Sequence, residues 1–220
     1  MPNLLCLQAF FQCFCFIFIC SIGMILFEKL KEYDIILGSQ SPRRQDLLKQ
    51  THIPFRVVSK NVPEDFNEEA SPEDIVLSLC RVKANAYNNE LANPKTLLIT
   101  ADTIVFFNGQ VLNKPGDKYQ TANMLELLSG CVHDVYTGVC IKSIEKETAF
   151  FERTSVTFKT LTPEEIWFYL ENYEPFDKAG GYGIQDWIGL VAIQRIEGSY
   201  HNVVGLPVSR VFKELKAFIC

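Results

Sequence analysis

The segment that most constrains the fold is the strand–loop–helix unit YDIILGSQSPRRQDLLKQ at residues 33–50. YDIILGS is typical of a short buried strand, QSPRR of a loop, and QDLLKQ of a helix. A strand that leads directly into a helix is the opening unit of an α/β domain. The chain has 220 residues, of which 48% are hydrophobic and 21% charged. These values favour one globular domain, with room for two lobes.

The next segments predict a helix and a hairpin. Ser71 is an expected N-cap, with Pro72 at the first helical position. Apolar residues then recur at every third or fourth position, as in an amphipathic helix. Residues 97–107 predict a strand that the polar pair Asp102–Thr103 interrupts. The dipeptide at 108–109 is Asn-Gly, which predicts a turn into a short strand near residues 111–112.

The second half of the chain predicts an antiparallel strand pair between two helices. The expected elements are a helix at 120–128, strands at 133–144 and 150–161, a helix at 166–173 capped by Thr162, a loop at 174–185, an apolar strand at 188–196, a turn at 198–207 and a last helix from near Pro207. There is no internal repeat and no interdomain linker.

The N-terminal segment carries no charge from Met1 to Phe27 and has nearly the length of a membrane-spanning helix. It lacks the basic start and the small-residue cleavage site of a signal peptide, and Gln8 and Gln12 interrupt the apolar run. A third interpretation places the natural start at Met24. We favour this one, so residues 1–23 are a non-native leader or an apolar extension, and 24–220 form a single domain.

Charge and cysteine content exclude several classes of protein. The net charge is -5 and the sequence pI about 5.3, which argue against a surface for binding duplex nucleic acid and favour a small polyanionic ligand. The cysteines outside the N-terminal segment are scattered, so we expect reduced and mostly buried thiols at Cys80, Cys131, Cys140 and Cys220. Their spacing does not predict structural zinc.

Residues 39–44, SQSPRR, combine two hydroxyls and two guanidinium groups where a strand ends and a helix begins. Backbone N–H groups, the helix dipole and the arginine forks of Arg43 and Arg44 can converge there on phosphate oxygens. The alternative is an ordinary loop with solvated arginines. The presence of Ser39 and Ser41 favours an anion site.

Asp102 is the strongest candidate for chemistry, since a carboxylate between two apolar runs is costly unless it is bonded, paired or bound to metal. A purely structural Asp102 is the alternative. Lys114 follows after the length of a hairpin, which can return a cation to the same end of the sheet. The acidic loop that contains Glu64 offers oxygen ligands for Mg²⁺, although such runs are usually solvated.

A glycine-rich stretch, DKAGGYGIQ, ends on Gln185 and permits close backbone approach to a ligand. It matches neither a dinucleotide-binding fingerprint nor a Walker loop. His133 and His201 are interpreted as strand or turn residues with local partners.

Together these segments form an ordered series of motifs: SxSPRRxxLL at 39–48, LxxxKA at 79–84, ADT at 101–103, KP at 114–115, LSGxxHxVxTxV at 128–139, DKAGGYGIQ at 177–185 and GSYHNVVGLP at 198–207. The series resembles the Maf family of nucleotide pyrophosphatases. The resemblance implies an elongated α/β fold with a mixed sheet, two lobes and a cleft between them, similar to the inosine-triphosphate pyrophosphatases. Members of the family are often dimeric, so the resemblance also implies a homodimer.

The SPRR form together with a closing glutamine resembles the branch of the family that hydrolyses dTTP and UTP, or modified pyrimidine nucleotides, to the monophosphate and pyrophosphate. By this resemblance Asp102 is the catalytic proton acceptor, and Arg43, Thr103 and Gln185 govern base choice. The remaining predicted site residues are Ser39, Arg44, Lys83 and Lys114 for phosphate, and Glu64 with Asp102 for a divalent Mg²⁺ or Mn²⁺ ion. The tryptophan-containing IQDWIG sequence departs from the family pattern and is expected to alter only the cleft rim.

The predicted protein is therefore a cytoplasmic enzyme with a nucleoside triphosphate substrate, no nucleic-acid partner and no membrane attachment. Two alternatives stay open: a nucleotide-binding regulator of cell division without turnover, and a membrane-tethered interaction protein that uses residues 4–27 as an anchor.

Overall fold

The computed structural model describes residues 28–219. The predictions for the leader at 1–23, the start at Met24 and the thiol of Cys220 lie outside the described residues. Within the described part, no helix is both long and apolar enough to span a membrane.

A seven-stranded mixed sheet forms the centre of the molecule, in the order β2-β1-β3-β5-β6-β7 with β4 paired to β3. β1 pairs parallel with β2 and with β3, and the other neighbours are antiparallel. The strands are β1 (Asp34–Leu37), β2 (Arg56–Val57), β3 (Thr96–Phe107), β4 (Gln110–Leu112), β5 (Val132–Lys142), β6 (Glu147–Phe158) and β7 (Ile193–Glu197). The structure confirms the predicted α/β mixed sheet and the Asn108–Gly109 hairpin.

Helices pack against the sheet along the molecule. They are α2 (Pro42–Gln50), α3 (Pro72–Asn85), α4 (Lys118–Leu128), α5 (Pro163–Tyr173), α6 (Trp187–Ala192), α7 (Tyr200–Val204) and α8 (Val208–Ile219), with short 3₁₀ turns η1 (Glu90–Ala92) and η2 (Ala179–Gly181). The predicted caps are confirmed: Ser71 accepts from the Asp74 amide, and Thr162 with Glu165 forms a full capping box.

Alternating side chains of β1 and β3 join hydrophobic clusters on opposite faces of the sheet. Ile35, Leu97 and Ile99 pack with α8, whereas Ile36 and Leu98 pack with α3 on the other face. Helix α3 can approach β5 closely because Gly138 has no side chain. A Cβ at this position would lie 2.2 Å from the Val76 carbonyl oxygen. Gly138 is the register partner of Asp102, so this close contact places α3 beside the polar pair of β3.

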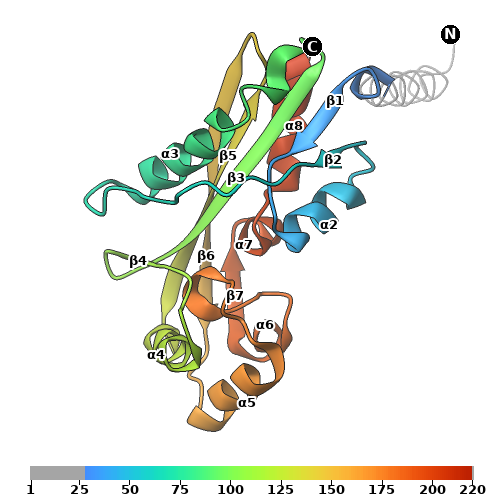
Figure 1. The fold of residues 1–220 in the computed structure, drawn as a ribbon. Coiled ribbons are helices and arrows are strands. Elements are labelled where there is room, and N and C mark those ends of the chain that lie inside the picture. Colours follow the sequence, from blue (N-terminus) through green and yellow to red (C-terminus); the bar gives the residue numbers. More distant parts are fainter. Residues whose placement is uncertain (1–27, 220) are drawn as a thin grey trace, which may run out of the picture.

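Figure 1 shows an elongated molecule in which β3, β5 and β6 run from the upper end towards the lower part. Helices α3 and α8 flank the upper part of the sheet, and α4, α5 and α6 gather around its lower part. The predicted two-lobed shape is confirmed. Both lobes share one sheet and one main hydrophobic core.

One edge of β3 has a gap in its pairing. β1 pairs with β3 only along Thr96–Ile99, and β4 pairs only with residues 105–107. Between them, residues 100–104 are paired on the β5 side alone among the described strands. Asp102 and Thr103 lie in this gap, where backbone groups are open to side chains and ligands.

Four predicted details are wrong. Helix α2 begins at Pro42, so both arginines lie in its first turn instead of a loop, because proline is pre-set for a helix start. Asp102–Thr103 does not interrupt β3. The apolar stretch 188–196 is helix α6 followed by β7, since a short apolar run fits either state. The turn at 198–207 contains helix α7, which Ser199 caps by accepting from the Asn202 amide.

Candidate active site

A cavity of about 440 Å³ lies at the gap in β3, between the two lobes. This volume is within the range of small-molecule sites. All nine predicted site residues line it: Ser39, Arg43, Arg44, Glu64, Lys83, Asp102, Thr103, Lys114 and Gln185. They come from α2 and the loop before it, the segment before α3, α3 itself, β3, the loop after β4, and the glycine-rich loop.

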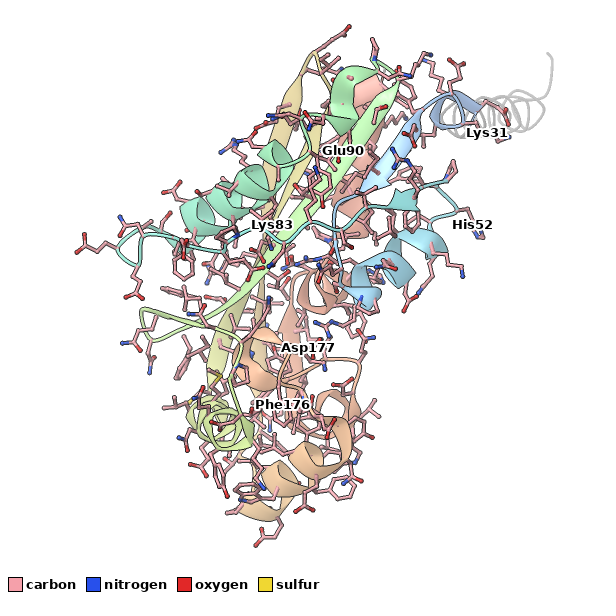
Figure 2. All side chains as sticks on the ribbon, in the orientation of Figure 1. Lys31, His52, Lys83, Glu90, Phe176 and Asp177 are labelled. Atoms are coloured by element: carbon pink, nitrogen blue, oxygen red, sulfur yellow. The ribbon has the colours of Figure 1, made fainter. Side chains whose placement is uncertain are left out.

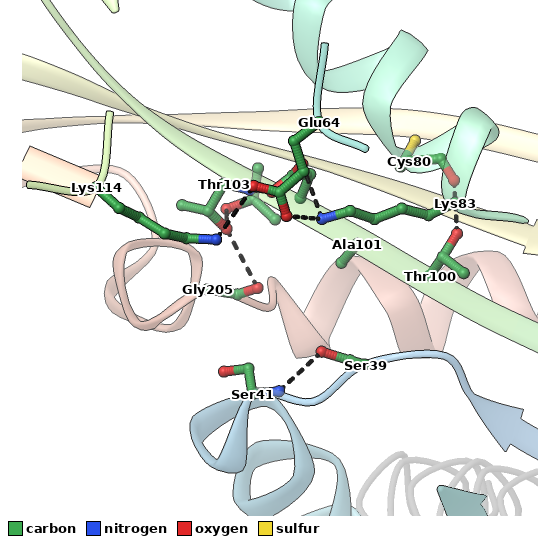
Figure 3. Close-up of polar contacts among 12 residues, drawn as sticks. Ser39, Ser41, Glu64, Cys80, Lys83, Thr100, Ala101, Thr103, Lys114 and Gly205 are labelled. Carbon is green, nitrogen blue, oxygen red and sulfur yellow. Dashed lines mark hydrogen bonds and ion pairs between the residues drawn. The ribbon is translucent and has the colours of Figure 1, made fainter. Parts of the chain in front are cut away.

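A chain of ion pairs joins four of these residues. Lys83 donates from Nζ to Glu64 Oε1 at 2.7 Å and to Asp102 Oδ2 at 3.0 Å. Lys114 donates to the other Glu64 oxygen at 3.1 Å. In Figure 3 the two lysines approach Glu64 from opposite sides. The sequence-based expectation that Lys114 returns to the end of the sheet that holds Asp102 is confirmed.

Asp102 is buried, with 6% of its surface exposed, and the prediction that it is paired or hydrogen-bonded is confirmed. Its Oδ1 accepts from the Thr103 amide at 2.8 Å, and its Oδ2 accepts from Lys83. Burial opposes ionisation of Glu64, but Lys83 and Lys114 outweigh it and lower the pKa of that carboxyl. The carboxylates of Glu64 and Asp102 are both held close to the ammonium group of Lys83.

Arg43 also lines the cavity. Its Nη1 donates to Asp177 Oδ2 at 3.0 Å, across a separation of 134 residues, and this is its only ion pair among the described residues. Burial raises the pKa of Asp177, but Lys178 and Arg43 more than offset it, so the pKa is lowered overall. In Figure 2 Lys83 and Asp177 both lie near the middle of the molecule, one from each lobe. Arg43 lies in α2 and Asp177 begins the glycine-rich loop, so their contact joins these two segments.

Arg44 is bonded to the protein at every guanidinium nitrogen. Nε donates to the Gly205 carbonyl at 2.7 Å, Nη1 to the Ala101 carbonyl at 2.8 Å, and Nη2 to Thr103 Oγ1 at 2.9 Å. A longer bond of 3.5 Å joins Nη1 to Ser39 Oγ. Burial lowers the pKa of Arg44, and Asp102 opposes this. Neighbouring arginines thus have different surroundings.

The glycine-rich loop is anchored in the lower lobe and presents Gln185 to the cavity. Gly180 and Gly181 have positive φ values and pack against Val105 and Thr121, where a Cβ would lie within 3.0 Å of a side-chain atom. Gln185 itself is exposed and has space for a ligand.

Tyr182 fixes the loop to β5. Its hydroxyl lies 2.7 Å from His133 Nε2, and both side chains are buried. Burial lowers the pKa of His133 to about 4. The prediction of a local partner for His133 is wrong, since Tyr182 is 49 residues away; Nδ1 has no partner among the described residues.

Sequence reasoning missed several residues that line or support the cavity. Asp177, Lys178 and Lys60 line it, and Thr137 bonds Thr103 at 2.9 Å behind it. Asp177 and Thr137 lie inside motifs quoted above, but their roles depend on partners distant in sequence. Six lysines and arginines and three carboxylates line the cavity, so a positive site exists within an acidic chain. This agrees with the predicted small polyanionic ligand.

The thiols follow the prediction in part. Cys80 and Cys140 are free and buried, and burial raises the pKa of each to about 12. Cys131 is also free but only partly buried. No group of three or more histidine, cysteine or acidic side chains suited to hold a metal occurs among residues 28–219.

The fold and the site define an α/β protein with a cleft in which cationic side chains outnumber carboxylates around a buried, lysine-paired aspartate. Residues 34–218 match the model of the family described as Maf-like protein. The chain belongs to this family.

Similar proteins from three bacteria share most of the length of the chain, and each is named dTTP/UTP pyrophosphatase. The one from Porphyromonas gingivalis is 49% identical over 195 residues, which cover 88% of this chain and 98% of that protein. Those from Parabacteroides distasonis and Bacillus cereus are 45% and 48% identical, covering 88% and 84% of this chain and 100% and 95% of the relative.

Solved structures of low sequence identity also match part of the fold. The Ham1 protein of Staphylococcus aureus is 11% identical, with a TM-score of 0.41 over 57% of this chain and 71% of that one. A dITP/XTP pyrophosphatase from Mycobacterium abscessus is 17% identical, with a TM-score of 0.38 over 57% of this chain and 72% of that one.

Proposed function

We propose that this protein hydrolyses nucleoside triphosphates to the monophosphate and pyrophosphate, with dTTP and UTP as its preferred substrates. The relatives named for this activity, at 45–49% identity over most of the chain, support the substrate class. The observation that carries the proposal is the convergence of all nine predicted residues on one cavity in which cations outnumber carboxylates.

The cations bind the triphosphate. A triphosphate carries several negative charges, so the site must neutralise them before a nucleophile approaches. Arg43, Lys83 and Lys114 have ammonium or guanidinium groups that only carboxylates hold in the described structure, and substrate oxygens can replace those partners. The Ser39 hydroxyl accepts from the Ser41 amide, which leaves its own proton available to a phosphate oxygen.

Asp102 orients or deprotonates the attacking water. Its Oδ1 is held by the Thr103 amide, so the carboxylate has a fixed direction, and its Oδ2 accepts from the Lys83 ammonium. A base must lie within hydrogen-bond reach of the proton it removes, and this carboxylate lines the cavity. In-line attack at the α-phosphorus then releases pyrophosphate, whose charge the lysines neutralise.

A divalent Mg²⁺ or Mn²⁺ ion suits the donor set. Glu64 and Asp102 direct oxygens at one position, which Lys83 Nζ occupies at 2.7 and 3.0 Å. Magnesium sites commonly use one or two carboxylates and take their remaining ligands from phosphates and water. When bound, the ion would neutralise phosphate charge and activate a water. Loss of turnover in excess EDTA, and its return with added Mg²⁺ or Mn²⁺, checks this part.

Base choice rests on Gln185. Its amide can accept from N3–H and donate to O4 of thymine or uracil, whereas cytosine presents the opposite pattern at both positions. Arg43 and Thr103 are the other residues proposed to govern this choice. The Thr103 hydroxyl is bonded to Arg44 and Thr137, so its contribution is to the shape of the wall behind the substrate.

The site of attack can be tested with isotopic water. Hydrolysis of dTTP in H₂¹⁸O should place the label in dTMP and leave pyrophosphate unlabelled. Label in pyrophosphate would show attack at the β-phosphorus and contradict the proposed chemistry.

We further propose a cytoplasmic homodimer without nucleic-acid partners. The free thiols of Cys80, Cys131 and Cys140 suit a reducing compartment, and the net charge of -5 disfavours duplex binding. Cell fractionation and size-exclusion chromatography with light scattering test these points. The regulator without turnover is the second candidate, and catalytic release of pyrophosphate by the purified chain would exclude it.

A further inference from the structure

The two arginines of the SPRR motif face different partners. Arg43 contacts one exposed carboxylate, Asp177, which a phosphate can displace. Each nitrogen of Arg44 instead donates to an oxygen of the protein, at 2.7 to 2.9 Å for the shortest bond of each. A phosphate could contact Arg44 fully only by breaking bonds that its burial makes costly to lose.

The hydrogen bonds of Arg44 take the place of strand pairing at the gap in the edge of β3. No strand pairs with β3 on the β1–β4 side at residues 100–104 of the described chain. The carbonyl of Ala101 would be an unpaired edge group there, and Arg44 Nη1 satisfies it. Nε reaches the Gly205 carbonyl at the end of α7. One side chain therefore ties β3 to α7 where a neighbouring strand is missing.

Asp102 lies between the two positions that Arg44 holds. Ala101 precedes it and Thr103 follows it, and both accept from Arg44. The Thr103 amide in turn donates to Asp102 Oδ1 at 2.8 Å, so movement of Thr103 would turn the carboxylate. Displacement of a reacting group by 1 Å can cost about 100-fold in rate.

We propose that Arg44 is a positioning residue that holds β3 on both sides of Asp102 and so aims its carboxylate, while Arg43 makes the arginine contact with the triphosphate. This division rests on the proposed function, because it assigns roles within the same site.

The test compares matched variants at the two positions: Arg43→Gln, Arg43→Lys, Arg44→Gln and Arg44→Lys in the full chain. Steady-state kinetics with dTTP give kcat and KM. Affinity for the α,β-imido analogue of dTTP, which resists cleavage, gives binding without turnover. Thr103→Val provides a milder variant that removes one acceptor of Arg44 and keeps the side-chain shape.

For Arg44→Gln we expect kcat to fall by about 100-fold while affinity for the analogue stays close to that of the parent. Arg44→Lys should remain impaired, because one ammonium cannot satisfy three separated acceptors. Arg43→Gln should weaken analogue binding by about tenfold or more, and Arg43→Lys should recover much of it. Thr103→Val should lower kcat in part, again without loss of analogue affinity.

Equal loss of analogue affinity in Arg43→Gln and Arg44→Gln would overturn the assignment, as would full activity of Arg44→Lys. If Arg44→Gln does not fold, Arg44→Lys and Thr103→Val decide the question by the same two readouts. Turnover by the parent tests the proposed function separately. If the parent binds the analogue but does not turn over dTTP, the affinities still show which arginine contacts phosphate.

Discussion

The buried His133 should make the protein sensitive to acid. Burial lowers the pKa of His133 from 6.5 to about 4, so the folded protein resists a proton that the unfolded chain accepts. A group with a depressed folded pKa contributes stability above its unfolded pKa and loses it as pH falls. From these two pKa values, the titration of His133 should lower the free energy of unfolding by about 2 kcal/mol when the pH falls from 7.5 to 5.

Urea denaturation at the two pH values measures this effect, with His133→Gln as the test variant. Other groups that change protonation between these pH values do so in parent and variant alike, so the comparison removes their contribution. His52→Gln is the matched control, because His52 is exposed. Any constant cost of either substitution does not affect the pH dependence.

The parent and His52→Gln should show the same loss between the two pH values, and His133→Gln should show about 2 kcal/mol less. An equal loss in all three proteins would refute the reasoning, since it would mean that His133 is protonated without penalty beside Tyr182.

Three further predictions concern the site and the close packing behind it. Asp102→Asn should lower kcat by about 10²–10⁴-fold and still bind the α,β-imido analogue of dTTP; undiminished turnover would remove Asp102 from its role. Gln185→Ala should change the relative kcat/KM for dTTP, UTP and CTP with a smaller loss of rate, and an unchanged profile would contradict its role in base choice. Gly138→Ala should destabilise the fold by about 3 kcal/mol in urea denaturation, because its Cβ would meet the Val76 carbonyl; a stability equal to the parent would show that α3 can move away freely.

Local signals were sufficient for most secondary structure. Ser71 and Thr162 cap helices through contacts within three residues, and the Asn108–Gly109 turn adopts positive φ at both positions. Where the local signal was ambiguous, the prediction was wrong. Residues 188–193 are apolar enough for a strand, but residues up to Ala192 form α6, in which Gly189 lies close to the Ile184 carbonyl.

Which of the predicted residues line the cavity could be expected from the sequence, but the contacts between them could not. Residue patterns singled out the SPRR segment and Asp102, and the family resemblance supplied the rest of the nine predicted residues that line the cavity. The partners of the two arginines could not be read from the sequence, because Asp177 lies 134 residues from Arg43 and Gly205 lies 161 residues from Arg44. These contacts depend on the arrangement of the lobes and on the unpaired edge of β3.

The most direct test of the proposed function is release of pyrophosphate by the full chain with Mg²⁺ or Mn²⁺, across dTTP, UTP, CTP, GTP and ATP. Asp102→Asn, purified in the same way, is the blank for contaminating activity. The account predicts equal amounts of pyrophosphate and monophosphate, fastest with dTTP and UTP, and little from the variant. No turnover of any of the five by folded parent protein, or release of orthophosphate instead, would contradict it.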